Sequence, residues 1–294
     1  METISLLWSL MPEGILISFA SAIFLPIIGG FLYLRRQAFL GIAVPQFSAA
    51  GIAAGLALLP FFPALQHSFL DHGHPPMSYL FLFAGGSAGL SLVLFSVLEK
   101  RARQGSMEGH MAAGFAMAGA MSLVFLEWSP AGGVLVDTLQ RGSVVVADYH
   151  SLAIVVVVFA LVAAIQMWFG RGFLFISYDR DAAKVQGYSP ARYDLFFNIM
   201  AGAAIGIGVM TLGPALVFGL LFMGPWLSRP SARSIRHFFL SIVGYSLLAT
   251  ALAWPTSFHL DLPYGPVVVL WLAVLAVCTQ LLRMILPNGG RQKA

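Results

Sequence analysis

Long apolar segments without a charged residue constrain the fold of this chain more than any other feature of its sequence. Leu195–Leu227 is one such segment of 33 residues, which as a single helix would be roughly 50 Å long against a bilayer hydrocarbon core of about 30 Å. The pair Gly213-Pro214 is expected to divide it into two short spans. Charged residues make up only 10% of the chain, compared with about 25% in soluble domains. The sequence therefore predicts an all-α, polytopic helical membrane protein, and the alternating segments of about ten residues that build a membrane β-barrel are absent.

The positions of the positive charges predict how the spans are oriented. Lys and Arg gather in clusters at 35–36, 100–103, 171–192, 229–236 and 283–293. Spans are expected at 12–34, 39–60, 78–98, 110–128, 151–169, two within 195–227, 237–257 and 264–286. These nine segments, with the N-terminus outside and the C-terminus cytoplasmic, place all of the 16 Lys and Arg residues except Arg141 inside. A first helix too short to span would give eight segments instead.

Several function classes lack their usual residues. The chain contains no G-x-x-x-x-G-K-[ST] nucleotide-binding loop, no H-E-x-x-H and no G-x-S-x-G, so it is expected not to be an enzyme and to hold no cofactor. The charge clusters are typical of cytoplasmic loops and do not indicate nucleic acid as a partner. The expected spans carry almost no ionisable residue, which a proton-driven carrier would need. A passive channel and a transporter powered by a partner both remain open.

Three stretches of the second half carry a more specific pattern. The basic segment "YDRDAAKVQGYSPARYD" has Asp179, Ala183 and Gly187 at a spacing of four, and the span "TLGPALVFGLLFMGPWLSR" comes after it. The turn "SFHLDLPYGP" then precedes the last span. In order and spacing these stretches resemble the permease subunits of ABC transporters for zinc, manganese and iron ions. The resemblance extends over nearly the whole chain, although the family's proline in the middle stretch appears one residue late, as Pro225 after Gly224.

The resemblance implies a fold and a set of partners. Residues 1–294 would form a single transmembrane permease domain in the cell (inner) membrane, surrounded by lipid. Its partners would be cytoplasmic ABC ATPase subunits, a second permease subunit (identical or different) and an extracytoplasmic solute-binding protein, and its cargo a divalent transition metal. The segment near 171–192 would couple the permease to the ATPase; a plain solvated loop is the alternative. The residues of this segment to which we assign the coupling are Asp179, Asp181, Ala183 and Gly187.

The second expected helix departs from the family pattern. Where the family usually reads Gly-Asp-x-x-Ser-His-Ala, with the Asp and His lining the ion pathway, this chain has Ile42 and Gln46, and Pro45 in place of the Ser. We expect Ile42, Pro45 and Gln46 still to line the pathway. The alternative for Gln46 is an interhelical hydrogen bond. Loss of both the carboxylate and the imidazole argues against a high-affinity divalent site here and leaves open a metal chelate or a small organic solute as cargo.

Metal ligands are available elsewhere in the sequence. The outside loop "QHSFLDHGHPP" and the last outside turn supply imidazole and carboxylate groups, which suit zinc. The candidate ligands are His67, Asp71, His72, His74, His259 and Asp261. An ordinary polar loop is the alternative for the first four. A methionine stripe near 107–121 suits soft metals but is better explained as packing.

Overall fold

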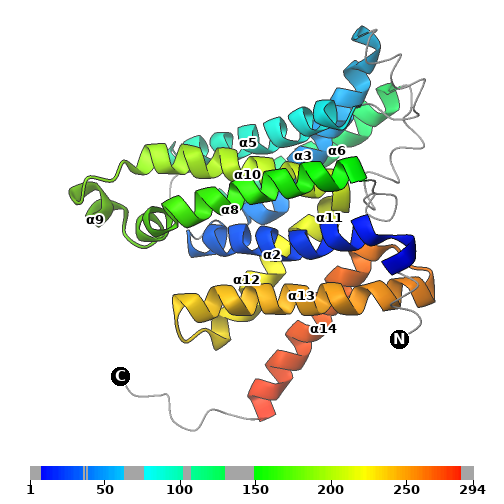
Figure 1. Cartoon of the computed structure of the whole chain (residues 1–294). Helices are drawn as coiled ribbons and strands as arrows, with labels where there is room; N and C mark the ends of the chain where they lie inside the picture. Colours follow the sequence, from blue (N-terminus) through cyan, green and yellow to red (C-terminus); the bar gives the residue numbers. More distant parts are fainter. Residues whose placement is uncertain are drawn as a thin grey trace.

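The computed structural model describes residues 8–35, 37, 39–62, 76–101, 107–129 and 149–285, and in these ranges the chain forms helices and no strand (Figure 1). The predicted all-α fold is therefore confirmed. The elements are α2 (Pro12–Leu34), α3 (Leu40–Leu58), η1 (Leu59–Phe61), α5 (Met77–Arg101), α6 (Met107–Trp128), α8 (Tyr149–Tyr178), α9 (Arg180–Val185), α10 (Pro190–Leu212), α11 (Pro214–Phe218), η3 (Gly219–Met223), α12 (Gly224–Ser228), η4 (Arg229–Ser231), α13 (Ile235–Leu260) and α14 (Tyr264–Ile285).

Eight of the described helices are long and apolar enough to cross a membrane. The ninth segment expected from the sequence is the continuous run of α11, η3 and α12, which is shorter than any of the eight. A first helix that fails to span was the sequence-based reason for a count of eight. The structure instead gives α2 a length of 23 residues, so the short segment is Pro214–Ser228.

The break between α10 and the short segment lies where the sequence predicts it. Gly213 adopts φ 80° and ψ 159°, a region that only glycine enters without strain, and so allows the turn that redirects the chain. Pro214 then occupies the first position of α11, where its missing N–H costs no hydrogen bond. The residue pair thus ends one helix and starts the next.

The described basic residues gather at one end of the bundle. Figure 1 shows the C-terminal end of α2, the short helix α9 and the connection between α12 and α13 at the left-hand end of the bundle. Arg35 comes directly after α2, Arg180 and Lys184 lie in α9, and Arg229 and Arg236 flank the start of α13. This arrangement confirms that these clusters share one side, as the spacing of the spans predicts.

Helices α5 and α10 pack with their backbones in close contact. A Cβ added at Gly202 would lie 2.6 Å from the backbone of Gly89, and one added at Gly206 would lie 2.5 Å from the backbone of Gly85. The small residues of α10 therefore form the groove into which α5 fits, as expected for small residues spaced four apart in membrane helices. Gly85 and Gly89 themselves have room for a Cβ, so the requirement for glycine falls on α10.

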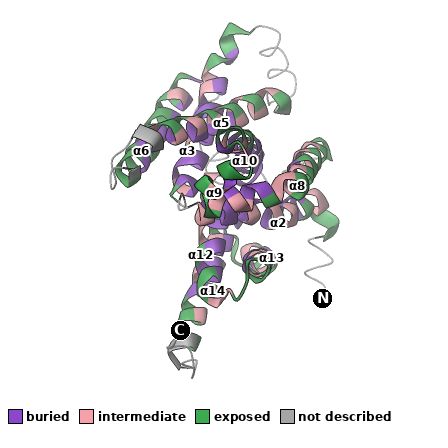
Figure 2. Ribbon diagram, turned by 90° about the vertical axis from the view of Figure 1, so that its left-hand side faces the viewer, coloured by how far each residue is buried: buried purple, intermediate pink, exposed green. Residues whose placement is uncertain are grey.

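The outer helices expose many large apolar side chains, which is unfavourable in water. Figure 2 shows the burial concentrated in α2, α3 and α10, with α8 largely exposed. On α8, Met167 is 81% and Trp168 85% exposed, and similar side chains recur on α6 and α14. Exposed apolar surface on this scale requires lipid or a partner subunit to cover it. The fold is therefore that of a multi-pass membrane protein.

Candidate transport cavity and coupling segment

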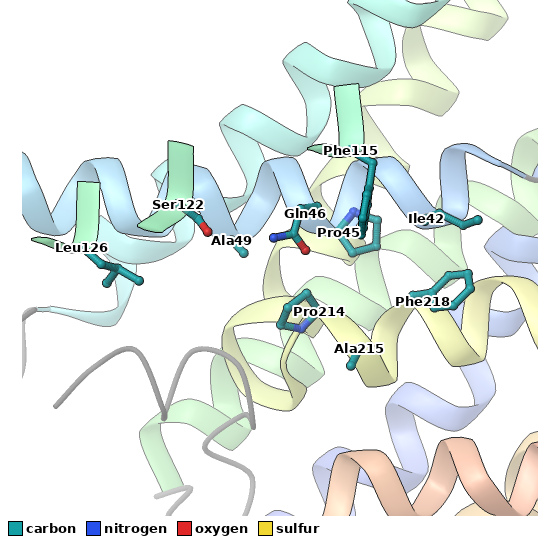
Figure 3. Close-up of a pocket in the computed structure, with 10 residues that line it drawn as sticks. All are labelled: Ile42, Pro45, Gln46, Ala49, Phe115, Ser122, Leu126, Pro214, Ala215 and Phe218. Carbon is teal, nitrogen blue, oxygen red and sulfur yellow. The ribbon is translucent and has the colours of Figure 1, made fainter. Parts of the chain in front are cut away.

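A cavity of about 350 Å³ lies between α3, α6 and α11 (Figure 3). Helix α3 presents Ile42, Pro45, Gln46 and Ala49 to it, residues spaced by three or four and hence on one face. The remaining lining residues are Phe115, Ser122 and Leu126 of α6 and Pro214, Ala215 and Phe218 of α11. The structure thus brings together the three residues to which the sequence assigns a pathway-lining role. That role itself stays a prediction.

The described lining of this cavity carries no ionisable side chain, and its polar side chains are Gln46 and Ser122. The Ser122 hydroxyl donates to the carbonyl of Gly119 at 2.9 Å, within its own helix. The Gln46 amide makes no hydrogen bond to any residue that the structure describes, so the interhelical bond considered as its alternative is not present there. Its Nε2 lies beside α6, 3.5 Å from where a Cβ at Gly119 would stand. The carboxamide can therefore donate to and accept from a ligand.

The wall opposite α3 is an irregular helix. After Phe218 the chain makes a π-helical stretch, η3, whose Leu221 carbonyl lies 2.1 Å from where a Cβ at Gly29 of α2 would stand. Glycine at position 29 therefore lets the backbone of η3 rest directly on α2. Single π-turns inside α-helices occur frequently at functional sites. Figure 3 shows Gln46 facing Pro214 and Ala215 at the start of this wall.

The segment near 171–192 contains a short helix with a complete set of caps. Asp179 is the N-cap of α9, and its carboxylate accepts from the N–H groups of Asp181 at 3.0 Å and Ala182 at 2.9 Å. Gly187, with φ +86°, donates to the carbonyl of Lys184, and Tyr188 donates to the carbonyl of Ala183, both at 3.0 Å. These two bonds are a Schellman motif, which requires a left-handed residue at this position.

The spacing of Asp179, Ala183 and Gly187 therefore has a local explanation. It sets the N-cap, the buried face and the C-terminal turn of one helix of six residues, with Ala183 fully buried. Asp181 pairs with Lys184 at 2.8 Å on the exposed side, and this hydrogen bond holds the pKa of Asp181 below its usual range. The sequence predicted the segment but not that its pattern specifies a capped helix.

A charge network that the sequence did not predict joins this helix to the bundle. Asp194 of α10 accepts from Arg35 Nη1 at 3.0 Å and also pairs with Arg180 at the start of α9. Arg35 Nε donates to Ser177 Oγ at 3.2 Å, and its guanidinium lies 4.2 Å from the centroid of the Phe197 ring. The two adjacent arginines after the first span were the available signal in the sequence, but the partner of Arg35 is 159 residues away.

The candidate metal ligands are only partly within the described residues. The four residues of the first outside loop, His67, Asp71, His72 and His74, lie outside them. His259 is exposed beside Phe258, and Asp261, with φ 50°, ends α13 on the surface. Neither lines the cavity, and no group of three metal-binding side chains occurs among the residues that the structure describes. A metal role for these residues stays a prediction.

This architecture, a bundle of membrane-spanning helices around a cavity with a capped helix at its basic end, is that of a membrane permease. The chain belongs to the ABC 3 transport family, whose model matches residues 8–283. The predicted assignment to the permease subunits of metal-type ABC transporters is thereby confirmed. Such subunits translocate cargo across the membrane and are not themselves catalytic.

Two solved structures share the fold. One is PsaBC from Streptococcus pneumoniae in complex with Fab, with a TM-score of 0.76 and 15% sequence identity over 94% of each chain. The other is described as an inward-facing conformation of a metal-chelate type ABC transporter, with a TM-score of 0.68 and 17% identity over 95% of this chain and 88% of that one. At these identities the likeness establishes the fold.

Proposed function

We propose that this permease imports a transition-metal ion, zinc, manganese or iron, as one of two permease subunits driven by cytoplasmic ABC ATPases and supplied by an extracytoplasmic binding protein. The observation that supports ATPase docking is α9, a capped helix at the basic end of the bundle. Its Val185 is 88% exposed and the adjacent Tyr178 62% exposed, so apolar surface is available to a partner there. The positive-inside rule makes this end cytoplasmic, with the N-terminus outside and the C-terminus inside.

A second candidate cargo is a metal complex whose coordination shell is already filled. The described cavity lining offers one free carboxamide, one serine hydroxyl that donates within its own helix, and otherwise apolar groups, which poorly replace the water shell of a bare divalent ion. A chelated metal keeps its own ligands and needs only shape and hydrogen bonds from the cavity. The similarity in fold to a metal-chelate type transporter supports the same candidate.

Reconstitution separates these candidates. The chain, purified with its ATPase, placed in liposomes and supplied with its binding protein, is expected to take up radioactive metal only when ATP is present. Uptake of free zinc, manganese or iron supports the ion, whereas uptake only of a preformed chelate supports the second candidate. Metal flux through liposomes that hold this chain alone would contradict both and favour a channel.

The cavity chemistry gives a further prediction. Ile42 and Gln46 lie one turn apart on the cavity face, so the double substitution Ile42→Asp and Gln46→His supplies a carboxylate and an imidazole to the same space. We expect zinc affinity, measured by titration calorimetry, to rise at least about tenfold, since each factor of ten requires only roughly 1.4 kcal/mol. The matched control is Ala54→Asp with Leu58→His, the same pair at the same spacing of α3 but outside the cavity. Equal affinities in both variants would show that the cavity is not where a metal can be held.

A further inference from the structure

The carboxylate of Asp194 is shared between three elements of the bundle. Arg35 is the C-cap of α2, Arg180 is the first residue of α9, and Asp194 lies in the second turn of α10. Only 9% of the Arg35 side chain and 13% of the Asp194 side chain are exposed, whereas Arg180 is 49% exposed. The pair Arg35–Asp194 is therefore held inside the protein, and Arg180 ties the short helix to it from the solvent side.

The two ion pairs of α9 differ in what they can transmit. Asp181 and Lys184 are three residues apart on one helix, with 90% and 60% of their side chains exposed, so their pair fixes nothing outside α9. The pair of Arg180 with Asp194 crosses from α9 to α10. A charged hydrogen bond to a carboxylate that is already buried and oriented by a second arginine holds its geometry better than an exposed pair.

Both helices that meet at Asp194 lead to the cavity wall. Helix α10 is mostly buried from Met200 onward and rises about 27 Å from Asp194 to Leu212, two residues before the cavity residue Pro214. Helix α2, closed by Arg35, contacts the backbone of η3 at Gly29. A displacement of α9 therefore reaches the segment Pro214–Met223 along two rigid, packed helices.

We propose that Arg180 is a positioning residue that transmits movement of the ATPase from α9, through Asp194 and Arg35, to α10 and α2. This inference rests on the proposed function, since it presumes an ATPase bound at α9. Arg180 contacts no cargo; it keeps α9 and the two helices moving together. Without it, an ATPase docked on α9 hydrolyses ATP while the cavity wall moves with it only loosely.

The test is the amount of metal transported per ATP hydrolysed in liposomes that hold the complete permease–ATPase complex. With Arg180→Gln we expect this ratio to fall at least about fivefold, which is the lower end of the changes that coupling between two sites typically produces. The amount of co-purified ATPase is expected to stay the same. Arg180→Lys retains the charge and is expected to keep most of the ratio. Arg236→Gln, the same change at an exposed arginine of α13 with no ion pair in the described structure, is the control.

Two outcomes would overturn the inference. An unchanged ratio in Arg180→Gln would show that the link carries no movement. Loss of the ATPase from that variant would make Arg180 a docking residue instead. Failure of the proposed function gives a different result, because the unsubstituted chain would then retain no ATPase or would transport no metal.

Discussion

Replacement of Gly206 by alanine is expected to prevent α10 from seating against α5 and to lower the free energy of unfolding by about 1–3 kcal/mol or more. The added Cβ would lie 2.5 Å from the Cα and N atoms of Gly85 and 2.9 Å from the carbonyl carbon of Ala84. All of these are backbone atoms, which cannot rotate away as a side chain does. Helices α5 and α10 must therefore move apart. Because the buried face of α10 also packs against α3 and α2, those contacts are disturbed as well.

The same interface offers a matched control. Gly89 lies on α5 opposite Gly202, but a Cβ added to it meets no atom of the described structure within 4 Å. Gly89→Ala is therefore expected to leave the midpoint of thermal unfolding and the monodisperse fraction in detergent close to those of the unsubstituted protein. Equal losses in Gly206→Ala and Gly89→Ala would contradict the assignment of the groove to α10.

Gly187→Pro is expected to release the ATPase, with at least about a tenfold drop in the amount that co-purifies. Proline fixes φ near −65°, whereas Gly187 has φ +86°, and it lacks the N–H that Gly187 donates to Lys184. The C-terminal turn of α9 must therefore unwind. The bundle is expected to stay folded, because Gly187 is exposed and a Cβ added to it would meet no described atom within 4 Å.

Asparagine provides the comparison for this position. Asn enters the left-handed region more readily than other residues with a side chain and keeps the N–H, so Gly187→Asn is expected to retain most of the ATPase. Pull-down of the tagged permease and quantification of the bound ATPase measure both variants. If Gly187→Pro retains as much ATPase as the unsubstituted chain, α9 is not the docking element.

The helices and their shared basic end could be predicted because each depends on local sequence. Apolar length fixes a span, and clustered arginines fix its side. Helix limits were less accurate: the span expected at 151–169 is α8, Tyr149–Tyr178, which continues through Arg171 because that side chain is exposed at the basic end. A charge near the membrane surface does not end a helix, so apolar length alone underestimates it.

The parts of the site that depend on contacts between distant segments could not be predicted from the sequence. The residues Ile42, Pro45 and Gln46 share a cavity, as one face of a helix requires, but the helices that complete the lining could not be inferred from sequence. The pairing of Arg35 with Asp194 joins residues 159 positions apart, and nothing in either local sequence specifies it. Glycine is required on α10 but not on α5, and this too depends on where each Cβ would point once the two helices are packed.

The π-helical stretch Gly219–Met223 determines which way the residues that follow it face. A π-turn closes its hydrogen bond one residue later than an α-turn, so it accommodates one inserted residue without rotating the next turn of the helix. The resemblance to metal-type permeases leads us to expect this proline one position before Pro225, which comes shortly after this stretch. Pro225 and Leu227, which follow the wide turn, are both buried in the bundle. The wide turn thus holds one more residue while leaving those after it facing the bundle, whereas one extra residue in an unbroken α-helix would rotate them by about 100°.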